Sequence, residues 1–131
     1  MQNTELRMEI SPYAQYQDFL RKGQLAYQFD VAAGRAVFYP RVVSPYGGKM
    51  EWRVSEGLGT VHAASWISPR EGGAYSVVLV DMDEGFRLMS NVIGSEAQSV
   101  SIGDRVRVRI HQDEDGQLIP LFERVRAGEL P

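Results

Sequence analysis

The chain has 131 residues, a formal charge of −3 and no cysteine, and its isoelectric point is near 5.4. This length is typical of one domain, with or without a small appendage, and 44% hydrophobic residues are sufficient for one core. The missing cysteines exclude disulfides, thiolate zinc sites and cysteine nucleophiles, and the acidic balance disfavours binding to nucleic acid or anionic membranes.

A short helix is predicted over the stretch SPYAQYQDFLRKG, residues 11–23. Ser11 suits the N-cap and Pro12 suits the first helical position, while Gly23 can end the helix. One apolar stripe recurs at helical spacing and consists of Tyr13, Tyr16, Phe19 and Leu20. A helix of this length is not stable alone, so the stripe must pack on the rest of the chain or on a partner.

From Gln24 onward the apolar residues alternate, which predicts a β-hairpin. Gly34 separates its two strands and can supply the positive φ that the turn needs. Pro40 ends the pairing because it has no N–H to donate, and SPYGG forms another turn. These elements define a predicted N-terminal segment over residues 1–48.

Five strand-like runs follow within residues 49–131, the second predicted domain. They are MEWRVSEGLGTVHAASWIS, AYSVVLVDM, FRLMSNVIG, RVRVRIHQ and LIPLFERV. Gly57 and Gly59 interrupt the first run, as expected of a strand that bends sharply or carries a bulge. Residues 94–104 form the longest connection and can hold one helical turn. Five short strands with a long, kinked first strand are typical of a Greek-key barrel of the OB-fold type.

Residues that often carry chemistry form no recognisable motif here. His62 and His111 lie in no zinc-binding spacing, and the acidic clusters around Asp81 and Asp113 lack the ligand order of an EF-hand. No G-x-S-x-G elbow occurs. We therefore expect no metal and no catalytic residue. A small enzyme acting on an acyl thioester is a weaker alternative, because the sequence offers it no nucleophile–base pair.

One strand alternates cationic and apolar residues, with Arg105, Arg107 and Arg109 on one face. A solvated outer face is the favoured interpretation. The alternative is an anion-binding stripe, as in OB-fold modules that bind nucleic acid. The acidic net charge counts against nucleic acid.

Aromatic residues gather in the N-terminal third of the chain. A helix and a hairpin of this size cannot bury all of them internally, so either the barrel or another protein covers them. A protein interface is the favoured alternative. The residues predicted for this partner interface are Tyr13, Tyr16, Phe19, Phe38 and Tyr39.

The order of several short motifs resembles one known family. The motifs are FLRKGQL, FYPR, MEW, GLGTVHAASWI, YSVVLVDMDEGFRLMSNVIG, SIGDRVRVRI and LIPLFE. They are similar to the thiolase-associated family in which a rubredoxin-like zinc ribbon precedes an acyl-CoA-associated OB-fold domain (domain of unknown function thirty-five). The resemblance covers residues 13–122.

The ribbon of that family carries two cysteine pairs, which correspond here to Asp30 and Ala33 and to Ser44 and Gly47. The resemblance therefore implies a ribbon outline without zinc. A structural zinc contributes on the order of 10 kcal/mol to a small module, so apolar contacts are expected to replace it. The residues expected to supply these contacts are Phe29, Val31, Val37, Phe38, Val42, Val43 and Tyr46.

The predicted fold class is thus mainly β, with an N-terminal helix, a metal-free ribbon-like hairpin and then a five-stranded OB-fold Greek-key barrel. The resemblance implies a non-catalytic accessory protein that partners a thiolase-like enzyme and helps to bind or channel acyl-CoA, with no cofactor of its own. Candidate contacts to the coenzyme A thioester are Arg41 for phosphate, Trp52 and Trp66 for stacking or packing, and Asn91. For both tryptophans a place in the barrel core is the favoured alternative. A second copy of the chain is a further candidate partner.

The expected location is the cytoplasm, without contact to membranes. The N-terminal residues lack the apolar region of a signal peptide. No apolar run is long enough to span a bilayer, and the absence of cysteine fits a reducing compartment.

Overall fold

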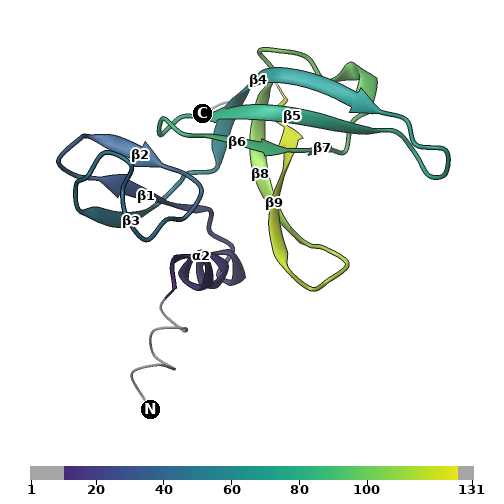
Figure 1. Cartoon of the computed structure of the whole chain (residues 1–131). Helices are drawn as coiled ribbons and strands as arrows, with labels where there is room; N and C mark the ends of the chain where they lie inside the picture. The colour runs from purple at the N-terminus through teal and green to yellow at the C-terminus, as the bar shows by residue number, and fades with distance from the viewer. Residues whose placement is uncertain (1–10, 127–131) are drawn as a thin grey trace.

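A helix, a three-stranded sheet and a six-stranded sheet follow one another along the chain (Figure 1). The computed structural model describes residues 11–126; residues 1–10, on which the signal-peptide prediction depends, and residues 127–131 lie outside the described part. No helix within residues 11–126 is long and apolar enough to cross a membrane. The elements are α2 (Pro12–Arg21), β1 (Ala26–Asp30), β2 (Arg35–Val37), β3 (Met50–Val54), β4 (Leu58–Ile67), β5 (Tyr75–Met82), β6 (Arg87–Ser90), β7 (Val92–Ile93), the short 3₁₀ helix η1 (Ala97–Ser99), β8 (Arg105–Gln112) and β9 (Leu118–Arg124).

Helix α2 begins and ends as its sequence predicts. The hydroxyl of Ser11 accepts from the N–H of Ala14 at 3.2 Å, and Pro12 occupies the first turn. At the other end Gly23 has φ of +79°, the left-handed conformation that commonly follows a helix. Tyr16 and Leu20 are buried, so one face of the helix packs into the protein.

The N-terminal sheet has the strand order β2-β1-β3. Gly34 turns the β1–β2 hairpin with φ of +65°, as predicted. The sequence placed residues 50–54 in the first barrel strand, and this strand assignment was wrong. These residues form β3, which pairs with the whole of β1, so the N-terminal sheet ends at Val54.

The physical reason for this correction is a polar bend between β3 and β4. The hydroxyl of Ser55 accepts from the N–H of Gly57 at 2.9 Å. The carboxylate of Glu84 accepts from the hydroxyl of Ser55 at 2.7 Å and from the N–H of Glu56 at 2.8 Å. These bonds, with φ of +82° at Gly57, divide one long sequence run into strands of two different sheets.

The second sheet has the order β6-β5-β4-β8-β9-β7. Its two end strands, β6 and β7, are separated in the chain by Asn91 alone. The carbonyl of Asn91 accepts from the N–H of Phe122 at 3.0 Å, next to the parallel pair Val92 and Phe122. The run FRLMSNVIG is therefore one broken strand, whose halves β6 and β7 are the two end strands of the sheet. This topology confirms the predicted OB-fold class.

The two sheets share one hydrophobic core, in which a row of aromatic rings joins the N-terminal segment to the second sheet. The ring of Phe86 stacks on Tyr27 at 4.7 Å and on Phe38 at 5.0 Å between ring centroids. Phe38 in turn meets Tyr16 of α2 edge-on at 5.7 Å. The deepest aliphatic positions include Leu20, Leu25, Val61, Val78, Val80 and Val106.

Candidate functional site

A buried carboxylate stands where the resemblance places the first zinc ligand. Asp30 has no solvent exposure. Its Oδ1 accepts from the N–H of Ala33 at 2.8 Å, and its Oδ2 accepts from the hydroxyl of Ser44 at 2.5 Å and from the N–H of Gly48 at 2.9 Å. A side chain on Gly48 would overlap this carboxylate. Asp30 therefore ties the two loops of the ribbon to β1.

These residues do not fit a zinc ion. Ala33 and Gly47 carry no ligand side chain, and the carboxylate of Asp30 is already occupied by three hydrogen-bond donors. Tetrahedral structural zinc sites are built from thiolates and imidazoles. Within residues 11–126, no three Asp, Glu or His side chains converge as metal ligands.

The expected apolar replacement for the metal was wrong in part. Val37 is buried, but Val31, Val42, Val43 and Tyr46 are 49–83% exposed. Short loops with tight turns direct these side chains outward, and the polar centre at Asp30 occupies the interior instead. Hydrogen bonds to one charged group, rather than aliphatic contacts, hold the loops of the ribbon.

We expect Asp30 to make the free energy of unfolding depend on pH in the acidic range. The hydroxyl of Ser44 and the N–H groups of Ala33 and Gly48 hold the pKa of Asp30 below its ordinary value of 3.8. The folded state therefore binds fewer protons than the unfolded state, so this stabilisation is complete above the ordinary pKa and is lost as pH falls through the lower folded value. Asp30→Asn removes this ionisation. The difference in unfolding free energy between parent and variant should be constant above about pH 5 and shrink below about pH 4 in urea unfolding.

The lowered pKa values of Asp81 and Asp83 do not affect this comparison. Their pairing with Arg87 and Arg105 respectively lowers these values, and both pairs are present in parent and variant alike. If the difference in unfolding free energy between parent and Asp30→Asn stayed constant down to about pH 2.5, this would contradict a role for the Asp30 charge.

A groove of about 300 Å³ lies between α2, the corner after β2 and the seam between β6 and β9. Two strongly exposed tyrosines, Tyr13 at 55% and Tyr39 at 54%, line it together with Met89 at 61%. Its remaining lining is mostly apolar and consists of Tyr16, Gln17, Leu88, Ser90, Asn91, Leu118, Ile119, Pro120 and Leu121.

A glutamine positions the helix against this groove. The buried amide of Gln17 donates to the carbonyl of Leu118 at 3.1 Å and accepts from its N–H at 3.3 Å. One turn earlier, the hydroxyl of Tyr13 donates to the amide oxygen of Gln117 at 2.8 Å. These bonds attach α2 to the start of β9, so the helix forms a fixed wall. Sequence reasoning missed Gln17, because a polar residue next to an apolar stripe is ordinarily solvated.

The predicted partner residues separate into three groups. Tyr13 and Tyr39 are exposed at the groove, whereas Tyr16 and Phe38 pack into the aromatic row of the core. Burial raises the pKa of the Tyr16 hydroxyl above its ordinary range. Phe19 lies on another side of the helix, where it contacts the ring of Trp52 at 5.4 Å. For Tyr16 and Phe38 the structure thus shows packing on the barrel, because the barrel supplies Phe86 to cover them.

The four candidate contacts to coenzyme A lie on different elements. Asn91 lines the groove, and its amide donates to the carbonyl of Ser76. Trp66 is the cross-strand partner of Ser76 and is 47% exposed. Trp52 is half-buried against α2, where its indole N–H donates to Gln15. Arg41 is exposed near the Tyr39 corner.

Gln28 links two of these candidates. Its side-chain amide accepts from the N–H of Arg41 at 2.6 Å and donates to the carbonyl of Arg41 at 2.8 Å. It is also the cross-strand neighbour of Trp52. The structure thus gathers the candidates into two pairs, one around Gln28 and one around Ser76, rather than into one pocket.

The cationic strand is largely neutralised by neighbouring carboxylates. Arg105 makes two bonds of 2.8 Å with Asp83, and Arg109 lies 2.6 Å from Glu123. Arginines that are engaged in this way are less available for phosphate. This favours the solvated-face interpretation over an anion stripe.

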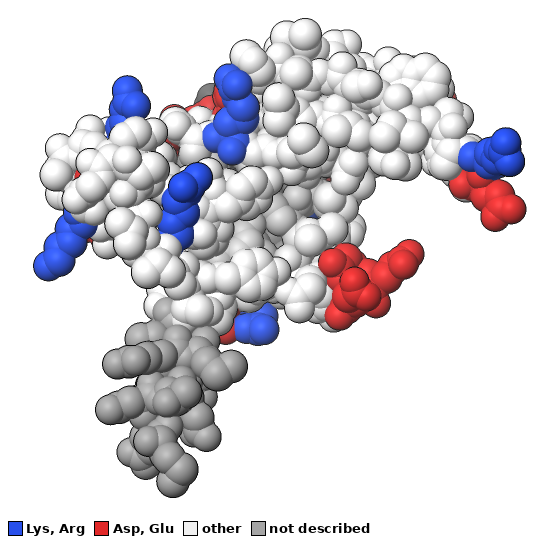
Figure 2. All heavy atoms as spheres, in the orientation of Figure 1, with Lys and Arg blue, Asp and Glu red and all other residues white. Residues whose placement is uncertain are grey.

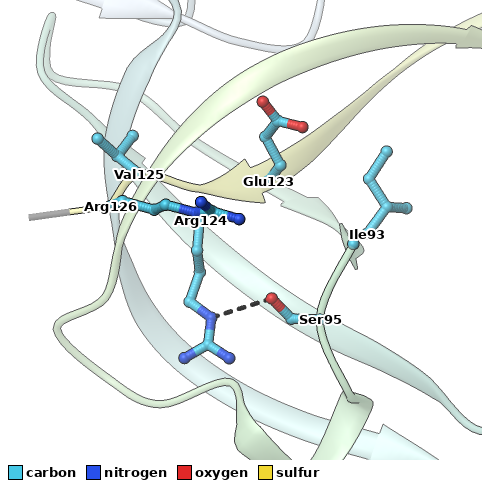
Figure 3. Close-up of a pocket in the computed structure, with 7 residues that line it drawn as sticks. Ile93, Ser95, Glu123, Arg124, Val125 and Arg126 are labelled. Carbon is cyan, nitrogen blue, oxygen red and sulfur yellow. Dashed lines mark hydrogen bonds between the residues drawn. The ribbon is translucent and has the colours of Figure 1, made fainter. Parts of the chain in front are cut away.

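A second hollow of about 490 Å³ lies between residues 93–95 and 123–126 (Figure 3). The guanidinium of Arg124 points across it, donating to Ser95 at 3.2 Å and to Ser99 at 2.6 Å. It also lies 3.6 Å from the carboxylate of Asp104. The arginine therefore joins the β9 end to the connection before β8, which is a structural role.

Comparisons with known proteins found matches to the second sheet and to most of the chain. Residues 52–111 match the family model described as ChsH2, C-terminal OB-fold domain. A DUF35 domain-containing scaffold protein of Methanothermobacter thermautotrophicus is 31% identical over 81 residues, an alignment that covers 55% of this chain and 61% of that protein. The chain thus spans less than two thirds of that relative's length.

A solved structure described as Ltp2-ChsH2(DUF35) aldolase shares the fold. Its TM-score is 0.73 at 22% identity, and the match covers 86% of this chain and 94% of that chain. The similarity extends beyond the barrel, since residues 52–111 alone are the part matched by the family model. The three comparisons agree that this chain is similar to DUF35 OB-fold proteins, the family that its sequence motifs resemble.

Proposed function

We propose that this chain is a non-catalytic accessory protein that binds a thiolase-like enzyme and helps to hold or channel its acyl-CoA. The observation that supports this most directly is the apolar groove with its two exposed tyrosines. The name of the M. thermautotrophicus relative, a scaffold protein, agrees with a role in assembly rather than in chemistry.

The groove has the composition of a protein-binding surface. Tyrosine and methionine are enriched at protein interfaces, and tyrosine often carries a large share of the binding energy. Tyr13 comes from α2, Tyr39 from the corner after β2 and Met89 from β6. Because Gln17 fixes α2 to β9, the surface is preformed and loses little entropy on binding.

The same groove can accept part of an acyl-CoA. A volume of about 300 Å³ is at the small end of ligand sites, which suits an acyl or pantetheine segment rather than the whole coenzyme. Asn91 supplies a polar group at its lining. Arg41, two residues after Tyr39, remains the phosphate candidate, although it is not among the residues that line the groove. Trp52 and Trp66 face other surfaces, so a ligand in the groove would not stack on them.

The partner surface is tested by a double substitution, Tyr13→Ser with Tyr39→Ser. Loss of both rings should weaken binding to the thiolase-like enzyme about 30-fold, equivalent to about 2 kcal/mol. The measurement is affinity capture from the native cell with mass-spectrometric identification, followed by titration of the captured enzyme against parent and variant.

Tyr46→Ser is the matched control, because Tyr46 is 49% exposed but belongs to the ribbon loop rather than the groove. Equal binding by the double variant, or repeated capture without any thiolase-like enzyme, would refute the partner. Thermal shift of the complex with acyl-CoA, compared with Arg41→Glu, tests the ligand separately. Turnover of acyl-CoA by the isolated chain would refute the non-catalytic role.

A further inference from the structure

Strand β4 has an open edge over its second half. It pairs with β5 as far as Ile67, but with β8 only over Leu58–Thr60. At Val61 the backbone still bonds to Gly103 and Asp104. Within the part of the chain that the structure describes, residues 62–67 of β4 pair with β5 on one side and with no strand on the other. Here β4 and β5 extend from the barrel as a two-stranded arm (Figure 1).

This edge lacks the usual protection against pairing. Natural edge strands carry charged residues or proline that prevent another chain from adding to the sheet. Residues 62–67 read HAASWI, with no lysine, arginine, acid or proline. The opposite edge of the arm is closed instead, because the side chain of Asn91 donates to the carbonyl of Ser76. The open edge is therefore available for an added strand.

Large apolar side chains surround the open edge. Trp66, Ile67 and Tyr75 are 44–47% exposed, and Ile102, next to the point where the β8 ladder ends, is 72% exposed. Residues 63–80 contain charge only at Arg70 and Glu71. Figure 2 shows the visible surface of the arm free of charged side chains except near its tip. An added strand would bury this surface.

We propose that the open edge of β4 pairs antiparallel with the same edge of a second copy of this chain, around a two-fold axis at Ser65. In this register Ala64 lies opposite Trp66 of the second copy, and Ala63 lies opposite its Ile67. Each large side chain thus meets a small one, on both faces of the joined sheet. Such an interface is isologous, so one patch serves both copies.

The register also fits the length of the open edge. An axis at Ser65 confines the new ladder to residues 63–67, which lie within the open stretch. Pro69 falls beyond it and cannot interrupt it. An axis one residue later would place Trp66 opposite Trp66 of the second copy. An axis one residue earlier would require Val61, whose backbone already bonds to Gly103 and Asp104.

The pairing extends the outer face of the sheet. Ala63 is in register with Leu79 and Ile67 is in register with Tyr75, so Ile67 of each copy would lie over the Ala63 and Leu79 region of the other. Main-chain bonds supply affinity in this mode of recognition, and the alternating side chains supply specificity. The groove at α2 is not part of this contact, and the inference does not depend on the function proposed above.

The dimer is tested with Ser65→Lys, which places two like charges opposite each other at the axis. The parent is expected to sediment at 29.4 kDa, twice the chain mass of 14.7 kDa, and the variant as a monomer. We expect its dissociation constant to rise about tenfold or more, because lysine on an edge opposes strand addition. Gln112→Lys, on the distant β8–β9 hairpin, adds the same charge and should remain dimeric. Circular dichroism confirms that both variants are folded.

Disulfide cross-linking through a single introduced cysteine tests the register in the folded protein. Because the chain has no cysteine, Ser65→Cys introduces a sole thiol that should face its copy across the axis. Directly opposed residues have Cβ atoms about 4.5–5.5 Å apart, close enough for a disulfide after small adjustment. Mild oxidation should cross-link Ser65→Cys rapidly, whereas Gln112→Cys should stay uncoupled.

Two results would overturn the proposal. The first is a monomeric parent at high concentration. If the Ser65→Lys variant of that monomer, unlike Gln112→Lys, also loses binding to a thiolase-like enzyme, the edge serves that enzyme instead. The second is a dimer that survives Ser65→Lys and does not cross-link through Ser65→Cys, since its interface would lie elsewhere.

Discussion

Asp30→Ala is expected to release the loops of the N-terminal sheet and to lower the melting temperature by roughly 5–10 °C. The substitution removes the acceptor for Ser44, Ala33 and Gly48 at a site without solvent exposure. Unpaired buried donors are costly because water cannot reach them. Hydrogen exchange should show early loss of protection at Ala33 and Gly48 while the core of the second sheet stays protected.

A double-mutant cycle with Gly48 separates this centre from general destabilisation. Gly48→Ala alone should be strongly destabilising, because its Cβ would overlap the Asp30 carboxylate. In an Asp30→Ala background that collision is gone, so the added cost should largely disappear. Purely additive effects, or equal loss of protection throughout the second sheet, would show that Asp30 does not organise the ribbon loops as a local unit.

Much of the fold could be predicted because local signals and tertiary structure agree. Ser11, Pro12 and Gly23 mark the helix with capping chemistry that does not depend on distant residues. Gly34 marks a turn for the same reason. The alternating runs of the barrel follow from burial of one face of each strand. These features depend on residues that are close together in the sequence.

The assignment of β3 failed because hydrophobic alternation does not identify a strand's partner. Residues 50–67 read as one long run, and the division between the sheets depends on Glu84, which lies far along the chain and accepts from Ser55 and Glu56. The burial of Tyr16 and Phe38 similarly depends on Phe86. Long-range contacts of this kind are not visible in local periodicity.

The role of Asp30 shows the same limit at the candidate site. The resemblance gave its position as a former zinc ligand, but not the fact that its neighbours would turn two N–H groups and a hydroxyl toward it. In a ribbon, the metal joins two loops by accepting four ligands. Here a carboxylate joins them by accepting from donors. The replacement is therefore polar, and its geometry depends on Gly48 being without a side chain.

The groove was only partly foreseeable. Tyr13, Tyr39 and Asn91 were singled out from the sequence and do line it, whereas Gln17 and the apolar wall of β9 were not. The exposed tyrosines could be predicted because the N-terminal segment has more aromatic residues than it can bury. The apolar wall could not, because it depends on how the seam between β6 and β9 faces α2 in the assembled fold.

The largest single loss of stability is expected for Phe122→Ala, about 3–5 kcal/mol. Phe122 has no solvent exposure and lies where β9 pairs with β8 at Val108 and with β7 at Val92. Its side chain fills the core beneath the seam that joins the two ends of the sheet order. Truncation leaves a cavity that neighbouring strands cannot close, because both are fixed by backbone ladders. Urea unfolding measures the change.

Phe122→Leu is the matched control and should cost less, because leucine keeps most of the buried volume. The two large predictions then separate parts of one molecule. Pro120 and Leu121 line the groove from the same strand as Phe122, so Phe122→Ala should abolish binding of the proposed enzyme partner together with protection of the second sheet. Asp30→Ala should weaken the ribbon loops and leave the β6–β9 seam protected. If both variants instead lost protection at the same residues in one transition, the polar centre and the seam would form a single cooperative unit, and the shared aromatic row of Tyr16, Phe38 and Phe86 would be the connection responsible.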